Sequence, residues 1–285
     1  MFAELVEQIT KGTKNDSDRL IQYVDTAKDF IGILKQIGTI PESIRQNSTS
    51  EKLFAKVSDA VLSRAFREIG LKSTPIKKRA NSADVQAESI YHDYSLVADA
   101  KVFRMSRTAK NQKDFKIASL SGWKKGANFS VLCAPFFHYP KSQSQIYSQA
   151  IEYNVCLLSW ENLIFLITHG FRESPNVNLS KLWNYSGGLK HTVLMADSEK
   201  CFLNLYKDMF LSFLRCQENE YAKMIEEQIL LINQQGLLGK TYWEGEKAKI
   251  ISYTKEKAIK ELIKASKIDE KINHINQFTR GIRHD

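Results

Sequence analysis

The chain has 285 residues, of which 43% are hydrophobic and 11% aromatic, so it can bury a sizeable core as one large domain or two small ones. Lysine and arginine number 41 against 32 for aspartate and glutamate, and the resulting net charge of +9 favours nucleic acid or another polyanion as a partner. No apolar run approaches ~18 residues, which excludes a transmembrane helix and predicts no membrane partner.

The cysteines and the N-terminal segment both indicate a cytoplasmic protein. Cys133, Cys156, Cys201 and Cys216 are widely spaced and form no C-x-x-C pair, so we expect free thiols rather than a disulfide or zinc site. The segment from Met1 to Glu7 carries acids where a signal peptide would carry lysines.

The first 72 residues are predicted to be helical. Apolar residues recur at three-to-four spacing through residues 1–38. Ser48-Thr-Ser-Glu51 then has the form of a capping box that opens an amphipathic helix, closed by Gly70. Glu51 has two interpretations: it is a helix cap, or it is a carboxylate that supports a second metal beside the active site.

The middle third, residues 73–170, is predicted to hold the functional core. A polar, basic loop over 73–82 comes first. Strands are expected at about 83–91, 94–101, 130–134 and 155–159, with helices at about 106–121, 142–152 and 160–167. Strands joined by helical crossovers predict an α/β/α sandwich.

The last portion, residues 171–285, returns to helical periodicity. Helices are expected at about 197–235 and 244–281, with Gly236 and Gly239 separating them. We expect one domain over 1–285, made of a helical part (1–72), an α/β core (73–170) and a second helical part (171–285).

Two carboxylates and a lysine stand out in the core. The apolar run Leu96-Val-Ala98 delivers Asp99 and Lys101 to one side of a strand, and Asp84 lies fifteen residues upstream of Asp99. Asp84, Asp99 and the Ala100 carbonyl are hard oxygen ligands suited to Mg²⁺, which lowers the pKa of bound water during phosphodiester hydrolysis. Lys101 can orient that water or stabilise the transition state. The alternative is a surface salt bridge between Asp99 and Lys101.

A basic segment follows directly. Residues 101–125 hold eight lysines or arginines against one acid, Asp114, and on a helix those from Arg104 to Lys116 form a band. This band either neutralises phosphates or is a solvated helix face. Asn111, Gln112, Lys113 and Asp114 add side chains that can read base edges in the major groove. The candidate DNA-binding residues are Lys78, Arg79, Arg104, Arg107, Lys110, Asn111, Gln112, Lys113, Asp114 and Lys116.

These residues carry a family resemblance. Asp84 with Asp99-Ala-Lys101 resembles the signature of the PD-(D/E)xK nuclease superfamily, although Ala83 replaces its proline. The segments 48–56, 97–101, 103–116 and 134–137 are similar to the HindIII family of type II restriction endonucleases.

The resemblance implies a restriction-endonuclease-like α/β/α core with a mixed central sheet and large helical N- and C-terminal portions. It also implies a homodimeric, Mg²⁺-dependent enzyme that cuts double-stranded DNA at the palindrome AAGCTT after the first A, leaving 5′-phosphate ends with 5′ overhangs. A cognate DNA methyltransferase is the expected functional partner, without a stable complex. Asp84, Asp99 and Lys101 would be catalytic, and Asn111, Lys113 and Asp114 would lie at the recognition helix. Lys77 departs from the family, which has a glutamate near that position.

Two other functions remain open from the residues alone. The same site would serve a structure-selective repair nuclease. If the carboxylates have lost the metal, the chain would be a non-catalytic DNA-binding protein.

Overall fold

The computed structural model describes residues 1–76, 82–107, 112–140, 144–191 and 198–281. These residues belong to two units, Met1–Gly236 and Leu237–Asp285. The helical portion expected after residue 171 is therefore divided between the units, and the α/β core lies wholly in the first.

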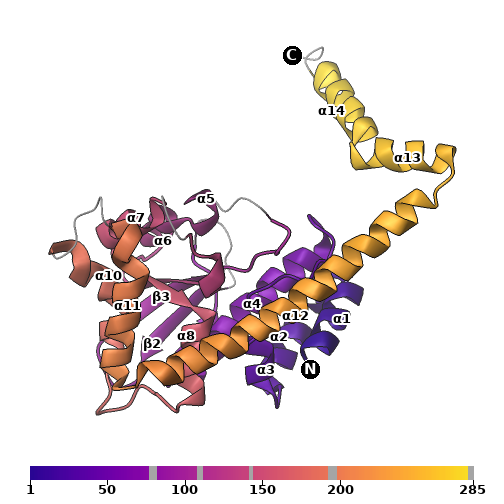
Figure 1. Cartoon of the computed structure of the whole chain (residues 1–285). Coiled ribbons are helices and arrows are strands. Elements are labelled where there is room, and N and C mark those ends of the chain that lie inside the picture. Colours follow the sequence, from indigo (N-terminus) through magenta and orange to yellow (C-terminus); the bar gives the residue numbers. More distant parts are fainter. Residues whose placement is uncertain (77–81, 108–111, 141–143, 192–197, 282–285) are drawn as a thin grey trace. The chain divides into compact units, whose positions relative to one another are not determined.

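A five-stranded sheet forms the centre of the first unit (Figure 1). Its strands, in spatial order, are β1 (Leu71–Pro75), β2 (Val85–Ser89), β3 (Ser95–Ala100), β4 (Phe129–Ala134) and β5 (Val155–Ser159). The pairs β1–β2 and β2–β3 are antiparallel, whereas β3–β4 and β4–β5 are parallel. This confirms the expected mixed sheet and its four predicted strands. Strand β1 occupies part of the stretch predicted to be a loop.

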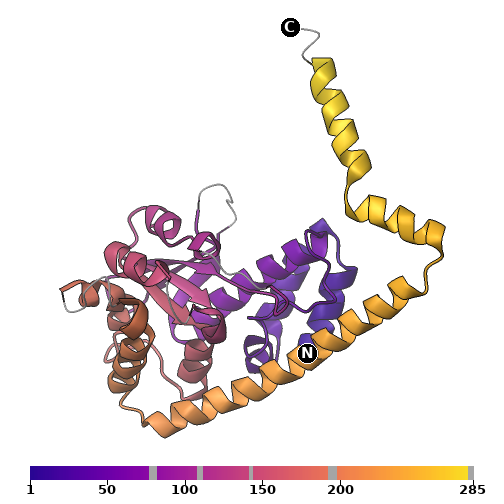
Figure 2. The ribbon, with the colours of Figure 1, turned by 45° about the horizontal axis from the view of Figure 1, so that its top comes forward.

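Helix α4 (Thr49–Glu68) supports one face of the sheet. The Ser48 hydroxyl accepts a hydrogen bond from the Glu51 amide (3.1 Å), which confirms Ser48 as the cap; the Glu51 carboxylate accepts from the Asn47 amide, so the reciprocal half of the box does not form. Its buried stripe packs against β1, β2 and β3. Three short helices surround α4: α1 (Phe2–Lys11), α2 (Ser17–Thr26) and α3 (Phe30–Leu34). Figure 2 shows these indigo helices gathered beside the violet α4.

The remaining helices of the first unit follow the strands. They are α5 (Gln112–Phe115), α6 (Ile117–Gly122), α7 (Ile146–Tyr153), α8 (Trp160–Thr168), α9 (Ser180–Trp183), α10 (Tyr185–Gly188) and α11 (Ser198–Leu214). Helix α6 packs against β3, β4 and β5, and α7 and α8 contact β5. The crossovers between the parallel strands are therefore helical, as an α/β/α core requires.

The prediction of one continuous helix over 106–121 is wrong. Residues 104–107 lie outside any helix, and the helices in the described part of that stretch are the short α5 and α6. Lys116 separates them because its backbone is left-handed (φ +50°), a conformation that an α-helix cannot continue through. The band of cations that such a helix would have carried is therefore not formed.

The prediction that Gly236 and Gly239 separate two helices is also wrong. Helix α12 (Glu218–Ile251) runs through both glycines. Each glycine costs a helix about 1 kcal/mol relative to alanine, which weakens the helix without ending it. Helices α13 (Lys255–Ala265) and α14 (Ile268–Gly281) complete the second unit.

Two further expectations can be compared with the structure. All four cysteines are free, and Cys133 and Cys156 are buried. Among the described residues, no helix is both long enough and apolar enough to cross a membrane.

Candidate active site

The antiparallel pairing of β2 with β3 brings the two predicted carboxylates together. Val85 lies opposite Ala98, and the Asp84 amide donates to the Ala98 carbonyl (3.0 Å), which places Asp84 beside Asp99. The Asp99 side chain is buried (4% exposed), and Lys101 Nζ forms an ion pair with its Oδ2. Asp84, Asp99 and Lys101 therefore meet at the end of β3.

The surroundings of Asp84 destabilise its charged form. Burial, the charge of Asp59, and hydrogen bonding with Asp99 and its charge together raise the pKa of Asp84 from 3.8 to about 9, although Lys101 opposes the shift. Asp99 Oδ2 is buried and has no hydrogen-bond partner among the described residues, apart from its ion pair with Lys101. A divalent cation would offset this accumulation of negative charge. The donor set therefore fits a hard cation such as Mg²⁺.

The Ala100 carbonyl faces the same edge as Asp84. The Ala98 carbonyl accepts a hydrogen bond from the Asp84 amide, and the Lys101 amide donates a hydrogen bond to the Cys133 carbonyl in β4 (2.7 Å). Because backbone groups alternate in direction along a strand, the Ala100 carbonyl points away from β4, past the end of the β2 pairing. No group of three Asp, Glu, His or Cys side chains in the described chain has metal-holding geometry. A cation would rest on two carboxylates and this carbonyl, with water and phosphate completing its shell.

Asp59 is a functional candidate that the sequence did not indicate. It lies on α4, and its charge is the second largest cause of the raised Asp84 pKa, after burial. In the sequence, Asp59 is one acid within an amphipathic helix, which is typical of a solvated face. The only signal is its position on the helix that packs across the strands carrying Asp84 and Asp99.

The main chain of Lys101 is held by Trp160, the first residue of α8. The Trp160 indole Nε1 donates to the Lys101 carbonyl (3.0 Å), while the Lys101 amide is bonded to Cys133. Both peptide groups of Lys101 therefore have fixed partners, which restricts the direction of the side chain toward Asp99.

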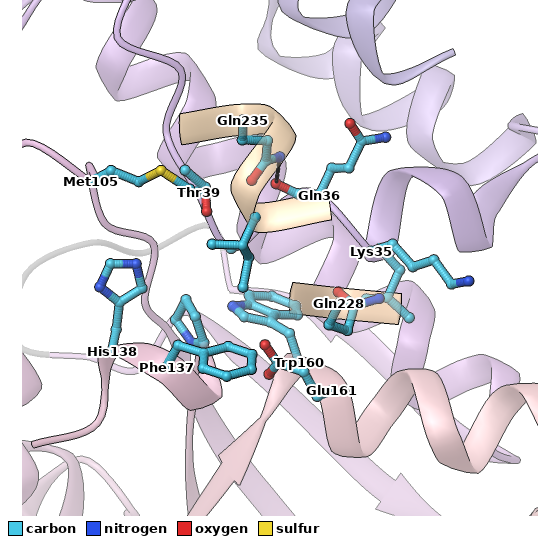
Figure 3. Close-up of a pocket in the computed structure, with 14 residues that line it drawn as sticks. Lys35, Gln36, Thr39, Met105, Phe137, His138, Trp160, Glu161, Gln228 and Gln235 are labelled. Carbon is cyan, nitrogen blue, oxygen red and sulfur yellow. Dashed lines mark hydrogen bonds between the residues drawn. The ribbon is translucent and has the colours of Figure 1, made fainter. Parts of the chain in front are cut away.

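Trp160 also lines a cavity of about 200 Å³ (Figure 3). The side chains drawn in Figure 3 come from the end of α3 and the segment after it, from Met105, from the stretch before Tyr139, from α8 and from α12. Gln228 of α12 is buried (2% exposed), and its Nε2 has no partner among the described residues. Gln235 Nε2 donates to the carbonyl of Gln36 (3.5 Å), and both residues line the cavity.

Glu51 acts as a cap and as an ion-pair partner. Its Oε2 accepts from the Asn47 amide (2.7 Å), and its Oε1 accepts from Arg104 Nε and Nη2 (3.2 and 2.8 Å). Arg104 also donates to the Pro41 carbonyl (3.2 Å), and its side chain is only 10% exposed. In the DNA-free protein both Glu51 oxygens are therefore engaged, and the Arg104 guanidinium is paired inside the protein. The supporting role of Glu51 at a second metal and the DNA contact of Arg104 stay predictions.

The other predicted DNA-binding residues are differently placed. Arg107 forms an ion pair with Asp114 of α5, whereas Lys113 and Lys116 are exposed. Gln112 begins α5, but its side chain lies outside the described structure, as do the residues Lys78, Arg79, Lys110 and Asn111.

Comparison with known proteins places the chain in a family. A family model described as HindIII restriction endonuclease matches residues 4–279. The type II restriction enzyme HindIII of Haemophilus influenzae is 36% identical over 282 residues, which cover 98% of this chain and 94% of that protein. A solved small subunit of a heterodimeric restriction endonuclease has a TM-score of 0.39 and 15% identity, over 63% of this chain and 97% of the other. The match over nearly the whole length shows that this chain belongs to the HindIII restriction endonuclease family.

Proposed function

We propose that this protein is a type II restriction endonuclease that uses Mg²⁺ to cut both strands of the palindrome AAGCTT after the first A. The products would be 5′-phosphate ends with 5′ overhangs. The observation that carries the proposal is the meeting of Asp84, Asp99 and Lys101 at the end of β3, in a chain 36% identical to HindIII.

The roles of the residues follow from their surroundings. Asp84, Asp99 and the Ala100 carbonyl would hold the cation, which supplies charge neutralisation and a water of lowered pKa when bound. Lys101, held through its own peptide groups, would orient the attacking water and donate hydrogen bonds to the phosphate oxygens. Asp59 would add negative potential from α4 that strengthens cation binding.

Site recognition would come from the segment around α5. Lys113 is exposed and can donate to guanine, and Asp114 can accept from the cytosine amino group. Arg107 holds the Asp114 carboxylate in the DNA-free protein. Recognition of the base would therefore replace Arg107 with the cytosine amino group as the partner of the Asp114 carboxylate.

A homodimer would match the two-fold symmetry of the site and provide one active centre for each strand. The enzyme would work in the cytoplasm beside a cognate methyltransferase that protects host DNA, without forming a stable complex with it.

Digestion of a long plasmid tests the proposal. Mg²⁺ should give discrete bands with ends at AAGCTT, and EDTA should abolish them. Asp99→Ala and Lys101→Ala should each abolish cleavage yet retain DNA binding, while the exposed controls Asp93→Ala and Lys190→Ala cut normally. A fully active Asp99→Ala or Lys101→Ala protein would contradict the catalytic assignment. Nicks confined to branched substrates would indicate a repair nuclease, and binding without any product would indicate a non-catalytic protein.

A further inference from the structure

Most described cations early in the basic segment 101–125 are occupied within the protein. Lys101 pairs with Asp99, Arg104 with Glu51, and Arg107 with Asp114. Lys113, Lys116, Lys124 and Lys125 form no ion pair with any described residue, and of these Lys124 and Lys125 lie together just after α6. They are available to neutralise an external anion.

The turn that carries Lys124 and Lys125 is fixed to the beginning of β3. The Ala127 amide donates to the Lys124 carbonyl (2.8 Å) and closes the turn. The Asn128 amide donates to the Ser95 carbonyl (2.9 Å), and Asn128 Oδ1 accepts from the Ser95 amide (2.9 Å). The two lysines therefore have a defined position relative to the strand that ends at Asp99.

These lysines lie over the sheet face opposite α4. Ser63 of α4 contacts Ser73 of β1 (3.1 Å between hydroxyls). Ser73 lies opposite Ala87 in β2, and Ala87 lies opposite Leu96 in β3, so these three side chains point to the face of the sheet that α4 covers. Alternate residues point the other way, and Val97 and Asp99 share this second face of β3.

A groove of about 730 Å³ opens on this second face. Its lining includes Thr74, Gln86, Val97, Trp123, Lys124 and Lys125. Glu88 is the one acid among the described lining residues, and Lys72 neutralises it (2.7 Å). The groove therefore has a net positive charge from Lys124 and Lys125.

We propose that this groove, the Lys124–Lys125 groove, binds the DNA backbone flanking the cut, with each lysine neutralising a phosphate. Ser95 and Asp99 are four residues apart, about 13 Å along an extended strand. Because each DNA strand carries a charge about every 3.4 Å of helix axis, the phosphates bound here would lie within a few nucleotides of the scissile one. The identification of the anion as DNA rests on the proposed function. The existence of the groove and its positive charge do not depend on that function.

Salt dependence of DNA binding tests the groove. A non-cognate duplex of about 30 base pairs is titrated without divalent cation, and log K is plotted against log salt concentration. The Lys124→Ala/Lys125→Ala protein should lose about 1.8 in slope, and about 10- to 100-fold in affinity at about 0.1 M salt, because two phosphate contacts are removed. Lys124→Arg/Lys125→Arg should keep the slope, since both charges remain.

The matched control is Lys181→Ala/Lys190→Ala, which removes two exposed lysines outside the groove. Its slope should remain that of the unaltered protein. An unchanged slope in the Lys124→Ala/Lys125→Ala protein, or an equal loss in both double variants, would overturn the groove. If the unaltered protein cuts plasmid but the Lys124→Ala/Lys125→Ala protein has the same slope as the unaltered protein, the proposal for the groove is refuted and the proposed function is not. If the unaltered protein neither cuts nor binds DNA, the proposed function and the proposal for the groove are both refuted.

Discussion

The hydrogen bond from Trp160 to the Lys101 carbonyl leads to a prediction about catalysis. Trp160→Phe removes the indole N–H and keeps an aromatic ring in the buried position. A buried hydrogen bond contributes about 1 kcal/mol net, and a carbonyl left without a partner costs about 1–3 kcal/mol. The Lys101 peptide would then have one fixed partner instead of two, and its side chain would sample directions away from Asp99.

Trp183 provides a matched control. Its Nε1 donates to the Tyr94 hydroxyl (3.2 Å), and Trp183 is fully buried, so Trp183→Phe also removes an indole hydrogen bond from a buried ring, but one that does not reach the main chain of Lys101. Tyr94 lies at the opposite end of β3 from Lys101. Both variants should unfold at temperatures about 2–4 °C lower per kcal/mol lost.

The cleavage step separates the two variants. Single-turnover cleavage with Mg²⁺ should slow about tenfold in Trp160→Phe, the effect of about 1.4 kcal/mol on the barrier, and should be unchanged in Trp183→Phe. DNA affinity without divalent cation should be the same for both. Equal single-turnover rates in the two variants would refute the idea that Trp160 positions Lys101.

Two further predictions concern acids. Because the folded protein keeps the Asp84 proton up to about pH 9 while the unfolded chain loses it near 3.8, stability without divalent cation should fall as pH rises through that window. Asp84→Asn should flatten this dependence in thermal unfolding with EDTA from about pH 5 to about pH 9; parallel curves for the two proteins would contradict the assigned pKa. Asp114→Asn should cost the specific site about 1–3 kcal/mol more than random DNA in equilibrium binding. Equal losses would make Asp114 only the structural partner of Arg107.

The sequence alone determined much of the core. Alternating and continuous apolar runs predicted β2 to β5, and the cap at Ser48 predicted where α4 begins. The pairing of an apolar strand end with Asp99 and Lys101 located the candidate site. These features are local, since each depends on residues a few positions apart. Strand β1 was missed because its outward residues Lys72 and Thr74 are polar and it begins an edge of the sheet.

Only the tertiary structure decided which charges meet. Glu51 and Arg104 are 53 residues apart in the chain, yet they form an ion pair in the folded protein, which no local pattern indicates. The role proposed for Asp59 follows from the packing of α4 across β2 and β3, and the role proposed for Lys124 follows from the hydrogen bonds that hold its turn to Ser95. The sequence pattern records which residues are buried and where helices begin. The partners of a charged side chain depend on strand register and helix packing, which long-range contacts determine.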